Sequence, residues 1–107
     1  MFRTTNGKGF QITFENGVTI SVQWGPGNYC DNYNENFKPR EQPVVRSRTA
    51  EIAIWDRGHC WHDFGGDQVE GNLTPNQVSE WIHKVSQPDF EVTGERPFFE
   101  LWGVEPE

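Results

Sequence analysis

The sequence has little of what membrane, secreted and nucleic-acid-binding proteins need. Only 34% of its 107 residues are hydrophobic, and no apolar run approaches the roughly 20 residues of a membrane span. The first ten residues, MFRTTNGKGF, lack the apolar segment of a signal peptide. Nine basic side chains stand against sixteen acidic ones, a net charge of −7. We therefore expect a cytoplasmic protein that binds neither membranes nor nucleic acids.

The charge is also unevenly distributed. Residues 1–53 carry six basic and five acidic side chains, a net charge of +1, whereas residues 54–107 carry three basic and eleven acidic ones, a net charge of −8. An acidic half repels nucleic-acid phosphates but complements a basic surface on a protein partner. The commoner role of such residues is to keep a small protein soluble.

Cysteine is scarce. Cys30 and Cys60 are the only two, and in a chain without a signal peptide they are expected to be free thiols. With His59 and His62 they are the candidate metal ligands, but on a strand His59 points away from Cys60 and His62. We therefore expect no metal and no cofactor, with Cys60 buried and the histidines exposed.

Catalytic motifs are also missing. The sequence has no nucleophile elbow and no HExxH, and the proline of WGPGNYC removes an amide that a phosphate-binding loop would need. A cysteine and a histidine could form a nucleophile–base pair, but two cysteines and three histidines offer such combinations in any small protein. We expect a non-enzymatic protein, with a metal- or cysteine-dependent hydrolase as the last alternative.

Aromatic residues, in contrast, are abundant. They make up 14% of the chain and include five tryptophans and eight phenylalanines. Since each aromatic side chain buries about 150–250 Å², a few of them can build a core. The length suits one domain over residues 1–107.

The clearest element is a β-hairpin over residues 10–24. Apolar residues alternate with polar ones on both sides of Glu15-Asn16-Gly17, namely Phe10, Ile12, Phe14, Val18, Ile20 and Val22. A three-residue loop places all of them on one face, whereas a two-residue Asn-Gly turn places apolar residues on both faces. Burial therefore favours the three-residue loop, with Gly17 in the left-handed conformation.

One helix is predicted over residues 74–87. Thr74, Pro75 and Gln77 have the spacing of an N-cap, a first helical position and a capping box. An apolar stripe follows at helical spacing, formed by Val78, Trp81, Ile82 and Val85.

Less regular segments complete the chain. Residues 26–43 lack periodicity and predict a long loop, residues 50–64 a second hairpin that turns at Asp56-Arg57-Gly58, and residues 98–102 a last strand. These elements predict an α+β fold: an antiparallel sheet of four to five strands, made of two hairpins and a C-terminal strand, with one amphipathic helix on one face.

The stretch QWGPGNYCDNYN at residues 23–34 is the candidate binding loop. Its amides can read neutral polar edges, its tyrosines offer stacking faces, and nearby tryptophans could wall a pocket. The alternative is that Asn and Asp only stabilise their own turns. The candidate ligand- or partner-binding residues are Trp24, Asn28, Tyr29, Asp31, Asn32, Tyr33, Trp55 and Trp61.

The run GKGFQITFENGVTISVQWGPGNYCDN, residues 7–32, resembles short bacteriophage- and prophage-encoded proteins that share a GKGF…NGxTxSVQWGxGNYC-type stretch. No activity of that family can be carried over to residues here. The resemblance implies a small, acidic phage product in the host cytoplasm, a setting in which proteins often bind host machinery or host immunity.

Two hypotheses follow. In the first, the chain binds and inhibits a host protein, for example an antiviral defence component, through its acidic half and Phe98, Phe99 and Trp102. In the second, the aromatic and amide loop over residues 24–36 sequesters a small molecule such as a nucleotide signal, with Arg40, Arg46 and Arg48 countering its charge. Self-association is a further way to cover the edges of the sheet.

Overall fold

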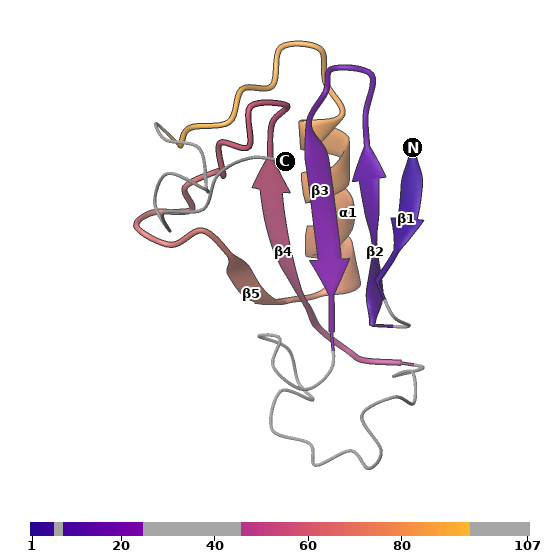
Figure 1. The fold of residues 1–107 in the computed structure, drawn as a ribbon. Helices are drawn as coiled ribbons and strands as arrows, with labels where there is room; N and C mark the ends of the chain where they lie inside the picture. Colours follow the sequence, from indigo (N-terminus) through magenta and orange to yellow (C-terminus); the bar gives the residue numbers. More distant parts are fainter. Residues whose placement is uncertain (6–7, 25–45, 95–107) are drawn as a thin grey trace.

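A computed structural model describes residues 1–5, 8–24 and 46–94 and confirms an antiparallel sheet with one helix packed on it (Figure 1). The five strands pair in the order β1-β2-β3-β4-β5, so that β1 and β5 form the two edges. The elements are β1 (Phe2–Thr4), β2 (Gly9–Thr13), β3 (Thr19–Gln23), β4 (Ala50–Trp55), β5 (Glu70–Leu73) and α1 (Pro75–Val85).

The β2–β3 hairpin has the register of the three-residue loop. Phe10 pairs with Val22 and Ile12 with Ile20, and the Phe14 amide donates to the Val18 carbonyl over 3.0 Å. Gly17 has a φ of 87°, a conformation that β-branched residues resist. All apolar side chains of the hairpin therefore share the face that α1 packs against.

The helix begins with a complete capping box. The Thr74 hydroxyl accepts a hydrogen bond from the Gln77 amide over 3.2 Å, and the Gln77 side chain accepts one from the Thr74 amide over 2.9 Å. At the other end, the Asn16 side-chain amide donates to the carbonyls of Val85 and Gln87, each over 2.8 Å. Asn16 lies in the β2–β3 turn, so this turn is bonded to the C-terminal end of α1.

The core lies between α1 and the three strands β3, β4 and β5, which are the strands that the helix contacts. Its fully buried large side chains are Ile20, Ile52, Ile54 and Val85. On the opposite face, the central strands carry mostly small and polar residues together with Trp55, and the hydroxyls of Thr13 and Thr19 share a 2.7 Å hydrogen bond there.

The expected second hairpin over residues 50–64 is only partly present. The chain turns back after Asp56, but the returning segment forms only an isolated bridge between Trp55 and Trp61. The strand that pairs with β4 on the side away from β3 is β5. The sequence of β5, Glu-Gly-Asn-Leu, has one apolar residue, and Asn72 has a φ of 55° beside a register shift. An irregular edge strand of this kind leaves no alternation to detect.

The short strand β1 was also missed, because three residues are too few to show a period. Two expected segments, the loop over residues 26–43 and the strand over residues 98–102, lie outside the described residues.

Candidate functional site

Much of the predicted binding loop lies outside the described residues. This applies to Asn28, Tyr29, Cys30, Asp31, Asn32 and Tyr33, and to Phe98, Phe99 and Trp102 of the C-terminal segment. The tryptophans Trp24, Trp55 and Trp61 are described and can be compared directly.

The structure brings two of these tryptophans together. Trp55 and Trp61 stack with their ring centroids 5.1 Å apart and their planes at 24°, on the face opposite the helix. Trp24 follows Gln23, which pairs with Glu51 at the far end of β4, and it packs against the core on the helix side. Trp24 therefore does not share a pocket wall with Trp55 and Trp61.

The candidate metal ligands also diverge. His59 is exposed in the turn, with a φ of 62°, and Cys60 is a half-buried free thiol whose amide donates to the Asp56 carboxylate. His62 is buried, which corrects the expectation that the histidines are exposed. Across residues 1–5, 8–24 and 46–94, no group of three His, Cys, Asp or Glu side chains could hold a metal ion.

His62 sits in an aromatic cluster between α1 and the segment that follows it. Its ring centroid lies 4.9 Å from that of Phe64, 5.8 Å from that of Trp81 and 5.5 Å from that of Phe90. The Thr93 amide donates to His62 Nδ1 over 3.3 Å, so this nitrogen is the acceptor of a neutral ring. Burial and, secondarily, the Lys84 ammonium lower the pKa of His62 below its usual 6.5, while Asp63 opposes this shift.

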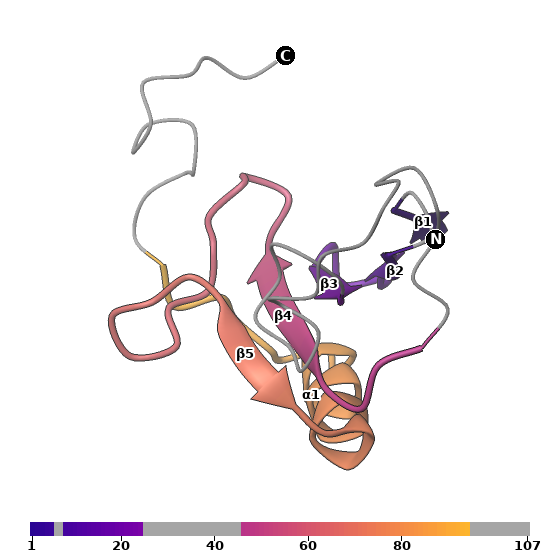
Figure 2. The ribbon, with the colours of Figure 1, turned by 90° about the horizontal axis from the view of Figure 1, so that it is seen from below.

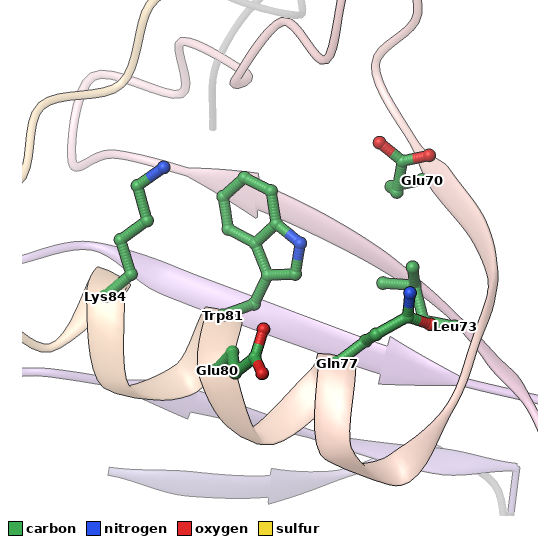
Figure 3. A pocket seen from close by; sticks show the side chains of 6 residues that line it. All are labelled: Glu70, Leu73, Gln77, Glu80, Trp81 and Lys84. Carbon is green, nitrogen blue, oxygen red and sulfur yellow. The ribbon is translucent and has the colours of Figure 1, made fainter.

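Next to this cluster, α1 and β5 form a groove of about 440 Å³ (Figure 3). It is lined by Glu70, Leu73, Gln77, Glu80, Trp81 and Lys84. Lys84 Nζ lies 4.7 Å from the Trp81 ring centroid, a cation–π distance. Two carboxylates, an amide and an ammonium give this lining no single charge preference, so the groove selects no ligand class.

A further feature of the described residues is an apolar strip on the helix-side face, at the edge of the sheet formed by β1 and β2. Figure 1 shows α1 behind β3 and toward β2, and Figure 2, seen from below, shows β1 at the edge of the sheet away from the helix. Phe2 pairs with Ile12, so both side chains lie on the helix-side face, together with Phe10 and Phe14. We call these four residues, Phe2, Phe10, Ile12 and Phe14, the apolar margin.

Exposure within the apolar margin rises toward the edge of the sheet. Phe10, Ile12 and Phe14 are half-buried against the core, while Phe2 is 80% exposed. Phe2 was not predicted as a binding residue, because its position depends on the pairing of β1, and three residues show no sequence period. This arrangement can bind an apolar surface without further folding.

The chain matches no protein-family model, and comparisons with curated proteins and with solved structures find no match. Within the described part of the chain, no helix is long and apolar enough to cross a membrane.

Proposed function

We propose that this chain is a non-enzymatic binding protein that attaches to a protein partner through the apolar margin. The observation that carries the proposal is Phe2, a large apolar side chain that is 80% exposed on an edge strand. A single exposed apolar residue is common on protein surfaces. Here it is continuous with three further apolar side chains on the same face.

The expected energetic gain is large enough for a specific contact. Burying a phenylalanine side chain contributes about 1.5–3 kcal/mol, and buried aromatic anchors dominate many protein interfaces. Because the margin lies on paired strands, binding would require little ordering of its backbone.

The resemblance of residues 7–32 to phage-encoded proteins suggests a host protein as the partner, and inhibition of a defence component as the outcome. The partner's function would be blocked because a surface is occupied, with no chemical step on this chain. For the alternative, sequestration of a nucleotide-like molecule by residues 24–36, the described residues add no favourable observation. It stays a hypothesis from the sequence.

A charge substitution within the margin tests the proposal. The tagged wild-type chain, Phe2→Asp and the control Asn76→Asp would be produced in host cells, and co-purified proteins quantified by mass spectrometry. Asn76 is exposed on α1, so the control adds the same charge away from the margin. We expect one host protein to be recovered with wild type and control and depleted at least about tenfold with Phe2→Asp. Equal recovery by all three would refute binding through the margin.

A further inference from the structure

We infer that the open edge of β1 binds an extended segment of the partner as an added strand, with apolar residues on the helix-side face and a carboxylate across from Arg3. This inference rests on the proposed function and adds its binding mode and the chemistry of the partner segment. Its support comes from the backbone of β1 and from its side chains.

Among the residues that the structure describes, the backbone bonds of β1 leave a row of donors and acceptors on its outer side without a partner. Met1 exchanges hydrogen bonds with Thr13, at 2.7 and 2.8 Å, and the Thr5 amide donates to the Gly9 carbonyl over 3.2 Å. In an antiparallel pair, hydrogen-bonded and non-hydrogen-bonded positions alternate. The N–H and C=O groups of Phe2 and Thr4 therefore point away from β2, toward the open edge of the sheet.

The side chains of β1 specify what a partner strand should carry. Phe2 and Thr4 lie on the helix-side face, where Phe2 extends the apolar margin, while Arg3 pairs with Gln11 on the opposite face. Neighbouring strands place their side chains in register on each face, and opposite charges across strands stabilise the pairing. An added strand would thus place apolar residues beside Phe2 and an acidic residue beside Arg3.

A second copy of this chain is a poorer occupant of this edge. An antiparallel pairing of β1 with itself centred on Arg3 sets two arginines directly opposite each other, which is destabilising. The inference therefore commits to a segment of a different protein.

Proline substitution separates strand addition from simple apolar contact. Thr4→Pro removes an N–H that points to the open edge and is not used in the β1–β2 pairing, and proline is tolerated at such edge positions. Thr4→Ala, which retains the N–H at the same position, is the matched control for backbone integrity. Amide chemical shifts of β2 would verify that the sheet is intact in each variant.

The first readout is recovery of the host protein. If Thr4→Pro and Phe2→Asp both deplete it at least about tenfold, strand addition is supported. Depletion by Phe2→Asp alone would overturn strand addition and leave the proposed function standing. Retention by both variants would overturn both.

The second readout uses a defined probe, a short peptide of alternating valine and glutamate, titrated into the isotope-labelled chain. We expect shifts at Phe2 and Thr4 and slowed exchange of their amides. The same peptide with lysine in place of glutamate should bind about five- to tenfold more weakly, and Arg3→Glu should reverse this preference. No preference between the two peptides would overturn the charge assignment. A dimer of the free chain that Thr4→Pro dissociates would show a second copy to be the occupant and would overturn the inference.

Discussion

Apolar side chains on the same face of the sheet have opposite surroundings at its centre and at its β1 edge. Ile20 of β3 and Ile54 of β4 are fully buried under α1, whereas Phe2 of β1, on the same face of the same sheet, is 80% exposed. The difference lies in what covers the centre and the edge. An apolar residue in a strand becomes core only where another layer reaches it.

Geometry explains why the cover is incomplete. A helix with its side chains is about 10–12 Å wide, and neighbouring strands are about 4.7–4.9 Å apart, so one helix covers two to three strands. The sheet has five, and α1 contacts β3, β4 and β5. Phe10, Ile12 and Phe14 still pack against the core, whereas Phe2 on the edge strand β1 lies beyond it, and we propose binding at the margin for this reason.

The largest expected loss of stability comes from a substitution in the strands that α1 covers. Ile20→Ala removes a fully buried side chain and should lower the free energy of unfolding by about 3 kcal/mol, since isoleucine-to-alanine changes in cores cost about 2–5 kcal/mol. Urea denaturation followed by tryptophan fluorescence measures the loss. A loss under about 1 kcal/mol would mean that β3 is not the centre of the core.

The next effect tests how the helix is held in place. Asn16→Asp keeps the side-chain oxygen that accepts from the Val18 amide over 2.9 Å but removes the donor to the Val85 and Gln87 carbonyls. It also sets a carboxylate against these carbonyls at the negative end of the helix dipole. We expect a loss of about 2 kcal/mol in the free energy of unfolding.

Asn76→Asp is the matched control for this change. It adds the same charge at the exposed N-terminal end of α1, where a negative charge is favourable. Equal stability of the two variants would contradict a role for Asn16 in anchoring the helix.

The stability of the fold should depend on pH through His62, which is buried beside Trp81 of α1. Because the pKa of His62 is lower in the folded chain than its usual 6.5, the unfolded chain binds the proton first as the pH falls. Its contribution to stability is therefore complete above pH 6.5 and is lost as the pH drops below that value. The measurement is the free energy of unfolding between neutral and mildly acidic pH, for wild type and for His62→Gln. Parallel curves for the two proteins would contradict this role.

The smallest expected effect on stability is at the margin. Phe2→Ala should change the free energy of unfolding by less than about 0.5 kcal/mol, because the side chain is largely exposed. The same denaturation assay compares it with Ile20→Ala. A loss as large as that of Ile20→Ala would show that Phe2 is core and would remove the contrast between the centre and the edge of the sheet.

Sequence reasoning succeeded where a local signal was complete. Six alternating apolar residues around Gly17 are enough to choose a register, since only one loop length buries them together. Thr74, Pro75 and Gln77 are likewise sufficient to start a helix, because each satisfies a local backbone requirement. These two elements, with the further strands predicted from the sequence, gave the expectation of an antiparallel sheet with one helix, which the structure confirms.

Sequence reasoning failed where pairing is decided by tertiary contacts. Strand β5 has one apolar residue and a bulge, and β1 has three residues, so neither carries a period. His62 looked like an exposed strand residue and is instead enclosed by rings from α1 and from the segment after it. The same limit applies to the apolar margin, because its exposure depends on how many strands the helix covers, and this is decided by tertiary packing.

The central claim, that the margin binds a partner, is tested most directly by a photo-crosslinking amino acid at position 2 of the chain produced in host cells. The same amino acid at position 76, exposed on α1, is the control. We predict a crosslink to one host protein from position 2 and none from position 76. Equal crosslinking from both positions, or none from position 2, would contradict the claim.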